Sequence, residues 1–183
     1  MTTTLTIVED PLDSRVVRDF LLTHLTEMRG TTSLESSHAL DLDGLRAPDI
    51  TVFTAWDADE RGADALLGTV ALKRHDAHLT ELKSMRIAPE ARGRGLSHRL
   101  LDRLVAEARS TGHTVMKLET GTQDYFIPAR AAYTRYGFTE CEPFGQYRVD
   151  PSSVYMELAL RSHVRERREC TGGPVPRTGP PPA

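Results

Sequence analysis

The chain has 183 residues, of which 39% are hydrophobic and 27% charged, and its formal net charge is −3. This composition is typical of a globular protein with one core, and it argues against a disordered or membrane-embedded chain. The charge is uneven, because residues 161–183 carry a net charge of +3 and residues 1–160 therefore carry −6. The sequence shows no basic face interleaved with aromatic residues, so nucleic acid is not an expected partner, and the acidic body fits a cationic substrate better.

Cysteine usage and the amino-terminal residues indicate a reducing compartment. The two cysteines are Cys141 and Cys170, the second of them in the basic tail, so no disulfide is expected, and no metal-ligand spacing is present. The first residues lack the charged and apolar regions of a leader sequence, and no segment is long enough to span a bilayer. We therefore expect a cytoplasmic protein with no metal site and no membrane contact.

The first half of the chain predicts two helical segments and four strands. Residues Leu5–Glu9 alternate as a strand, and apolar residues at helical spacing follow from Asp13 or Ser14 to about Met28. Residues Leu34–Leu45 predict a second, shorter helical or irregular segment. Three strands in an antiparallel row are expected next: Asp49–Trp56, Ala65–Arg74 and Leu79–Ile87.

The second half mixes helices and strands. Leu96–Ser110 has a clear apolar stripe and predicts a long helix that Gly112 ends. The elements expected after it are a strand at Thr114–Glu119, a short helix at Ala129–Tyr136, and strands at Phe138–Glu142 and Val154–Leu160. The order β-α-α-β-β-β-α-β-α-β-β indicates a mixed α/β (α+β) protein, and its antiparallel row argues against a doubly wound dinucleotide fold.

The run Arg92-Gly93-Arg94-Gly95-Leu96-Ser97 joins the last strand of that row to the long helix. Two glycines allow a tight turn with uncovered N–H groups, and a helix amino terminus beside them adds unpaired donors and partial positive charge. These features suit an anion, most naturally a pyrophosphate. The run lacks the Gly-Lys-Ser/Thr ending of a nucleotide P-loop, and a plain turn with solvated arginines explains the local residues equally well.

Two separated motifs carry a family resemblance. Residues 87–97 read Ile-Ala-Pro-Glu-Ala-Arg-Gly-Arg-Gly-Leu-Ser, and residues 133–138 read Tyr-Thr-Arg-Tyr-Gly-Phe. They resemble the Arg/Gln-x-x-Gly-x-Gly/Ala signature and the Tyr-x-x-x-Gly-Phe segment of the GNAT superfamily of acetyl-CoA-dependent N-acetyltransferases, and the element order is similar over about residues 5–160. The resemblance implies the GNAT fold, a mostly antiparallel central sheet flanked by helices, in a domain of residues 1–160. Residues 161–183 are rich in Arg, Gly and Pro, and this composition predicts a disordered tail.

The resemblance also implies a site for coenzyme A. In that family the glycine turn wraps the pyrophosphate with backbone N–H groups, and the preceding strand pairs with the pantetheine arm. The cofactor-binding positions carried over to this chain are Met85, Arg86, Ile87, Arg92, Gly93, Arg94, Gly95, Leu96 and Ser97. Many members have an asparagine seven residues before the tyrosine of the second motif, where this chain has Phe126, so those contacts must be made differently.

Two catalytic residues follow from the same resemblance. Tyr133 matches the tyrosine that protonates the leaving thiolate, and Glu81 matches the glutamate that deprotonates the amine through water. The amide of Met85 matches a donor to the oxyanion. From the residues alone, Tyr133 could also be a core aromatic residue and Glu81 an outward-facing side chain.

The acceptor site and the acceptor itself are predicted in outline. His38, Asp41, Trp56 and Tyr125 are candidates to line the site, and for each the alternative is plain packing or a solvated loop. We expect transfer of acetyl from acetyl-CoA to a primary amine of a small molecule, by direct attack in a ternary complex. The alternatives are a non-catalytic acyl-CoA sensor, an enzyme for protein or peptide amines, and an unrelated phosphate-binding protein. The edge formed by the last strands could pair with a second copy of the chain as a homodimer.

Overall fold

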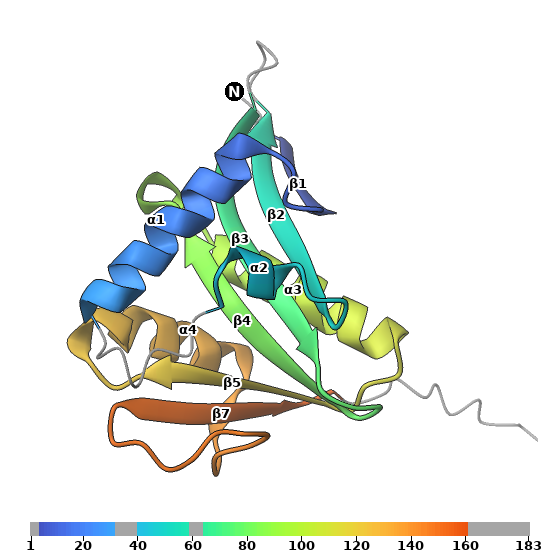
Figure 1. The fold of residues 1–183 in the computed structure, drawn as a ribbon, viewed down its shortest axis with the longest axis vertical. Helices are drawn as coiled ribbons and strands as arrows, with labels where there is room; N and C mark the ends of the chain where they lie inside the picture. Colours follow the sequence, from blue (N-terminus) through green and yellow to red (C-terminus); the bar gives the residue numbers. More distant parts are fainter. Residues whose placement is uncertain (1–3, 32–39, 59–63, 161–183) are drawn as a thin grey trace, which may run out of the picture.

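A mixed sheet runs through the protein. The computed structural model describes residues 4–31, 40–58 and 64–160, and the strands lie in the order β1-β2-β3-β4-β5-β7-β6 (Figure 1). The strands are β1 (Thr4–Glu9), β2 (Ile50–Ala58), β3 (Asp64–Arg74), β4 (Leu79–Ile87), β5 (Val115–Gly121), β6 (Thr139–Glu140) and β7 (Ser153–Ala159). The helices are α1 (Arg15–Thr31), α2 (Leu42–Leu45), α3 (Leu96–Ser110) and α4 (Ile127–Tyr136), with 3₁₀ turns η1 (Pro89–Ala91) and η2 (Asp124–Phe126).

β4 and β5 form the parallel pair of this sheet, and all the other neighbouring strands are antiparallel. Their pairing extends from Leu79 opposite Val115 to Leu82 opposite Leu118. Both strands continue beyond that point, and Figure 1 shows them diverging toward their carboxyl ends. The sheet is therefore open between β4 and β5 over the second half of each strand.

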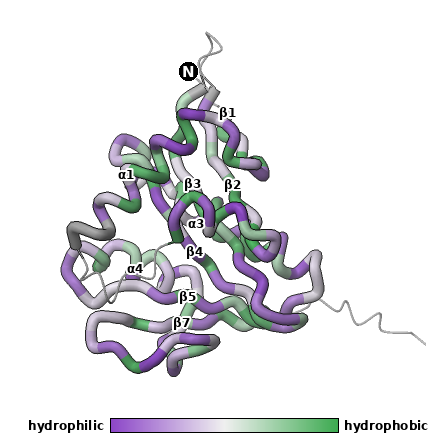
Figure 2. Tube along the Cα trace, in the orientation of Figure 1, coloured by the Kyte–Doolittle hydropathy of each residue, from purple (hydrophilic) through white to green (hydrophobic). Residues whose placement is uncertain are grey.

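Helices cover both faces of the sheet. In Figure 1, α1 and α2 lie in front of it and α3 passes behind it. On the α3 face, Leu100 and Leu104 are fully buried in a cluster with Leu72 and Leu118. On the α1 face, a second cluster contains Leu12, Val17, Leu21, Leu45 and Ala71. Successive strand residues point to opposite faces of the sheet. Each face packs against one of these two clusters, so the central strands carry apolar side chains on both faces. Figure 2 shows the matching alternation of hydrophobic and hydrophilic residues along α1.

The predicted fold class is confirmed, with one local correction. Of the helical or irregular segment expected over Leu34–Leu45, residues 34–39 lie outside the described part of the chain, and the described part contains the single turn of α2. The strand expected over Phe138–Glu142 is only the two residues of β6. The backbone N–H of Phe138 instead donates to the carbonyl oxygen of Tyr133 (3.0 Å) at the end of α4, and its side chain is 1% exposed in the core. The predicted disordered tail, residues 161–183, also lies outside the described residues.

None of the helices in the described ranges is both long and apolar enough to cross a membrane.

We expect Leu104→Ala to lower the free energy of unfolding by about 2–5 kcal/mol, because it removes a buried side chain and leaves a cavity between α3 and the sheet. Urea unfolding followed by circular dichroism measures the change. Leu22→Ala on α1, where the leucine is 47% exposed, is the matched control and should cost less than about 1 kcal/mol. Equal losses in the two variants would contradict the description of the core.

Candidate active site

A bulge in β4 shapes the site. Thr69 of β3 pairs with Arg86, and Ala71 pairs with Lys83, so β4 has one residue more than β3 across this stretch. Ser84, inside the bulge, has a left-handed φ of 51°, a conformation that is uncommon for a residue with a side chain. The extra residue breaks the regular ladder between the two strands at the level where β5 has already left β4.

The bulge reverses the side-chain alternation along β4. Leu82, before it, packs in the cluster on the α3 face, and its neighbours Glu81 and Lys83 point to the α1 face. After the bulge, Met85 and Ile87 pack against the α3 cluster. In the described part of the chain, β4 beyond Leu82 has no ladder partner on the β5 side. Its backbone N–H and C=O groups are thus open to a ligand there.

A cavity of about 710 Å³ occupies the gap between β4 and β5. Its walls are the second half of β4, the glycine turn and the start of α3 on one side, and the end of β5, η2 and α4 on the other. The predicted site residues that line it are Met85, Arg86, Ile87, Arg92, Gly93, Gly95, Leu96, Ser97, Tyr125 and Tyr133. Further lining residues include His24, Glu27, Lys83, Glu119, Phe126 and Arg135.

The glycine turn lies open along the cavity. Gly93 and Gly95 have φ values of 74° and 76°, in the left-handed region, and a Cβ added to either would meet nothing within 4 Å. Gly95 is the N-cap of α3 and offers no side chain to cap it, so the first N–H groups of that helix can meet an anion. Arg92 adds positive charge to the wall. Arg94 lies outside the lining, where it pairs with Asp57 (3.5 Å).

Tyr133 reaches the cavity from α4. It is 7% exposed, and its ring packs edge-on against Phe138 with the ring centroids 5.8 Å apart. Burial raises the pKa of the Tyr133 phenol above its ordinary value, and the charge of Glu119 raises it further. Within residues 4–31, 40–58 and 64–160, no side chain or backbone group hydrogen-bonds to the hydroxyl of Tyr133. The phenol is therefore protonated at neutral pH and can donate to a bound molecule.

Glu81 is the centre of a buried polar cluster beside the cavity. Its Oε1 accepts hydrogen bonds from Lys83 Nζ (3.1 Å) and from the Tyr147 hydroxyl (2.5 Å), and its Oε2 lies 2.8 Å from His75 Nε2. Burial raises the pKa of Glu81, but the charge of Lys83 and the hydrogen bonds lower it more, so the net direction is downward. Glu81 is 2% exposed and is not among the lining residues, whereas Lys83 is. Glu81 therefore does not contact the cavity directly, and its role as a base stays a prediction.

An ion pair ties α1 to β4 along one wall of the cavity. Arg86 Nη1 and Nη2 donate to the two carboxylate oxygens of Glu27 (2.6 and 3.0 Å), and the guanidinium lies over the ring of Phe20. The hydroxyl of Tyr125 donates to Glu27 Oε2 (3.3 Å), which links η2 to α1. Burial and then the charge of Arg86 lower the pKa of His24 to about 4, so this imidazole is neutral. Side chains thus bridge the cavity between α1 and η2.

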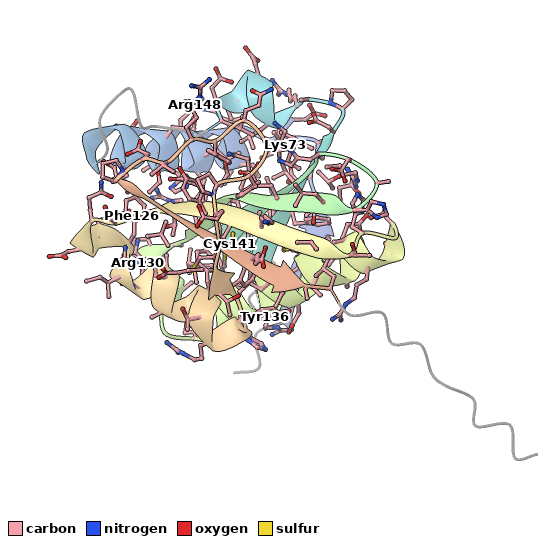
Figure 3. The ribbon with its side chains drawn as sticks, turned by 90° about the horizontal axis from the view of Figure 1, so that it is seen from below. Lys73, Phe126, Arg130, Tyr136, Cys141 and Arg148 are labelled. Atoms are coloured by element: carbon pink, nitrogen blue, oxygen red, sulfur yellow. The ribbon has the colours of Figure 1, made fainter. Side chains whose placement is uncertain are left out.

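Phe126 stands over the end of β5. A Cβ added to Gly121 would collide with the ring of Phe126, so this close approach requires glycine. Arg130 Nη1 donates to the carbonyl oxygen of Gly121 (2.5 Å), and Figure 3 shows Phe126 and Arg130 together by the carboxyl end of β5. Phe126 therefore contributes apolar surface to the cavity at the position where the resemblance implies an asparagine amide.

The other acceptor-site candidates lie elsewhere. Asp41 caps α2 by accepting a backbone hydrogen bond (2.8 Å), and Trp56 Nε1 donates to Thr54 Oγ1 (2.9 Å). Neither Asp41 nor Trp56 lines the cavity, and His38 lies outside the described residues. Of the three candidates that the structure describes, Tyr125 is the one at the cavity wall.

Comparison with known proteins identifies the family. The model of the acetyltransferase (GNAT) family matches residues 18–138. The chain belongs to the GNAT family. Its relatives include the uncharacterized N-acetyltransferase YsnE of Bacillus subtilis (strain 168), 40% identical over 151 residues that cover 82% of this chain and 97% of the relative. The IAA acetyltransferase of Azospirillum brasilense is 37% identical over 153 residues, 83% of this chain and 95% of the relative. This chain is thus an N-acetyltransferase, a class of acyltransferase.

Solved structures agree with this assignment. A Klebsiella pneumoniae protein named as an acyl-CoA N-acyltransferase is 28% identical, with a TM-score of 0.66 over 86% of this chain and 99% of that chain. An aminoglycoside 6'-N-acetyltransferase complexed with coenzyme A is 16% identical, with a TM-score of 0.61 over 86% of this chain and 98% of that chain. The second likeness is one of fold alone.

The sequence analysis of this GNAT protein missed several charged residues of the cavity, among them Lys83, Glu119 and Arg135. Lys83 and Glu119 directly follow Leu82 and Leu118, the last paired residues of β4 and β5. Side-chain alternation along both strands would have placed them, but only with the register of the parallel pair known. Arg135 lies two residues after Tyr133 on α4, inside the second motif, and its charge is the signal that could have marked it.

We expect Glu81→Gln to lower the free energy of unfolding at pH 7, and this loss to shrink as the pH falls. The folded-state pKa of Glu81 lies below its ordinary value of 4.5, so the carboxylate stabilises the fold above that pH and loses this contribution as acid protonates it. Urea unfolding of both proteins at several pH values between about 7 and 3.5 measures the difference. A difference that grows toward acid would contradict the ionised cluster.

Proposed function

We propose that this protein transfers acetyl from acetyl-CoA to the primary amine of a small molecule, in a ternary complex without an acyl-enzyme. The observation that carries the proposal is the 710 Å³ cavity, which joins the open glycine turn to the phenol of Tyr133. An anion site and an acid at two ends of one cavity are what transfer from a large anionic thioester needs.

The acyl donor is proposed to bind through backbone groups. The N–H groups of the glycine turn and of the first turn of α3 meet the pyrophosphate, and Arg92 and Arg135 supply charge beside it. The open backbone of Met85, Arg86 and Ile87 pairs with the pantetheine arm, because β5 does not occupy that edge of β4. The fit is supported by the empty space that faces Gly93 and Gly95.

The chemistry requires few protein groups. The bound thioester supplies the acetyl group. The backbone N–H of Met85 stabilises the negative charge that develops on the carbonyl oxygen of this acetyl group. Tyr133 donates the proton that the leaving thiolate needs, and burial keeps its phenol protonated until then. Glu81 keeps its predicted role as a base that acts through water. Lys83, which donates a hydrogen bond to Glu81, is the residue of this polar cluster that lines the cavity. Positioning of two bound substrates supplies much of the rate.

A small-molecule acceptor is favoured by the bridged shape of the cavity. The chain of contacts from Arg86 through Glu27 to Tyr125 closes it between α1 and η2, which leaves less room for a peptide than an open groove would. The name of the Azospirillum brasilense relative, an IAA acetyltransferase, is consistent with a small molecule.

A screen of acetyl-CoA consumption over polyamines, amino acids, aminoglycosides and peptides tests the proposal. We expect turnover with at least one small amine and formation of its N-acetyl product. Turnover with peptides alone would replace the small-molecule acceptor with a protein amine. Tight coenzyme A binding without any turnover would favour an acyl-CoA sensor.

We expect Gly95→Ala to weaken coenzyme A binding by about tenfold or more, because the new methyl group occupies the space that faces the pyrophosphate. Isothermal titration calorimetry measures the dissociation constant. Gly112→Ala is the matched control: Gly112 also has a left-handed φ, 84°, with nothing within 4 Å of an added Cβ, but it follows the other end of α3. Equal weakening in both variants would mean that backbone strain, and not the site, is responsible.

We expect Tyr133→Phe to lower kcat by about 100-fold while the dissociation constant for coenzyme A stays unchanged, because only the proton donor is lost. Steady-state kinetics and calorimetry measure the two effects. Tyr136→Phe is the control, since Tyr136 lies on the same helix and its hydroxyl donates to Asp102 (2.9 Å) outside the cavity. Full activity in Tyr133→Phe would remove the tyrosine from the chemistry.

A further inference from the structure

We propose that Glu27, on helix α1, is a positioning residue that holds the two walls of the cavity at the spacing required for acetyl transfer. It acts through Arg86 on the β4 wall and through Tyr125 on the η2 wall, and it takes no proton itself. The inference rests on the proposed acetyltransferase function and adds to it a residue that lies outside the sheet and outside both sequence motifs.

The segment of β4 that carries the proposed oxyanion donor is held at its ends. Across the bulge, β3 pairs with Lys83 and with Arg86, and Ser84 and Met85 lie between these two pairs. The pairing of β4 with β5 ends earlier, at Leu82. The direction of the Met85 N–H therefore depends on how firmly the residues at the two ends of the bulge are fixed.

Arg86, at one end of the bulge, is fixed by α1. Its side chain is 7% exposed, and its Nη1 and Nη2 donate to the two carboxylate oxygens of Glu27 (2.6 and 3.0 Å). Its Cζ lies 5.0 Å from the centroid of the Phe20 ring, on the same helix. Two parallel hydrogen bonds to one carboxylate fix both distance and orientation. The hydrogen bonding of Arg86 is also the main cause of the lowered pKa of Glu27, so the pair stays ionised at neutral pH.

The same carboxylate also reaches the opposite wall. Glu27 Oε2, which accepts from Arg86, accepts a second hydrogen bond from the hydroxyl of Tyr125 in η2 (3.3 Å). In Figure 1, α1 runs down toward α4, where this contact is made. Arg130 Nη1 of α4 donates to the carbonyl oxygen of Gly121 (2.5 Å), which fastens this wall to the end of β5. One oxygen atom of Glu27 thus joins the β4 wall to the wall formed by β5, η2 and α4.

The two walls carry the two groups proposed for the chemistry. Met85 precedes Arg86 on the β4 wall, and Tyr133 lines the other wall from α4, the helix that follows η2. A thioester between them must meet the Met85 N–H at its carbonyl oxygen and the Tyr133 hydroxyl at its sulfur. Small errors in such a spacing cost large factors in rate. Glu27 therefore affects catalysis through the positions of both groups.

Glu27→Gln tests the inference, because the amide keeps the size of the side chain and removes the charge that binds Arg86. We expect kcat to fall about tenfold, while the dissociation constant for coenzyme A, measured by calorimetry, changes by less than about threefold. The dependence of kcat on pH between about 6 and 9 should keep its shape, since Glu27 carries no proton in the reaction. Glu27→Asp keeps the charge and should recover part of the loss.

Two controls separate positioning from a loss of charge or stability. Asp19→Asn removes a carboxylate from the same helix, where Asp19 is 63% exposed and pairs with Arg15 (3.4 Å), and it should leave kcat unchanged. Leu104→Ala destabilises the core on the α3 face and should also keep kcat at temperatures where it is folded. A loss in either variant equal to that in Glu27→Gln would overturn the inference.

A double variant shows whether Glu27 acts through Arg86. We expect Glu27→Gln combined with Arg86→Gln to lose no more than about threefold in kcat beyond the larger single loss, because both substitutions break the same contact. Fully additive losses would overturn the inference. A loss in Glu27→Gln that differs about tenfold or more between two acceptors would also overturn it, because Glu27 would then contact the acceptor directly.

Unchanged kcat in Glu27→Gln refutes the inference and leaves the proposed function intact. If Glu27→Gln does not fold, Tyr125→Phe takes its place, because it removes only the hydroxyl that joins η2 to Glu27. We then expect a loss in kcat of about threefold or more, and full kcat would overturn the inference. Wild type that acetylates no amine would instead refute the proposed function itself.

Discussion

The parting of β4 from β5 is the constraint on which the rest of this structure depends. The two strands pair over only four residues each and then diverge, and the bulge at Ser84 turns the second half of β4 out of the regular ladder. An interrupted ladder leaves backbone N–H and C=O groups without partners, which is costly unless water or a ligand meets them. The fold therefore contains a backbone edge that is prepared to accept an extended molecule, with α3 beginning at its end.

Charges near this gap are arranged in pairs that hold its walls, and Arg86, Lys83 and Glu81 are the buried or nearly buried members. Arg86 with Glu27 joins β4 to α1, and Lys83 with Glu81 joins the strand to the loop that carries Tyr147. Removing Glu27 would leave the charge of Arg86 buried without its partner, and removing Lys83 would do the same to Glu81, which is strongly destabilising. These pairs therefore position the backbone of β4 along the wall of the cavity.

The sequence was sufficient for features that depend on local spacing. The glycine turn, the apolar stripe of α3 and the place of Tyr133 all follow from motifs or periodicity within about fifteen residues, and each has the expected element. Features that depend on distant strands could not be predicted. Lys83 and Glu119 come to line one cavity only through the parallel register of two strands separated by α3. Likewise, the spacing placed Glu81 on β4, but the hydroxyl that binds it comes from 66 residues away.

The central claim is that the gap between β4 and β5 holds coenzyme A, and amide mapping by nuclear magnetic resonance tests it most directly. Titration of the labelled protein with coenzyme A should shift the backbone amides of Met85–Ile87 and of Arg92–Ser97, with the amides of Gly93 and Gly95 among the largest changes. Amides of β1 and β2, on the far side of the sheet, should not move. Shifts confined to elements outside the cavity lining, or none at saturating coenzyme A, would contradict the account.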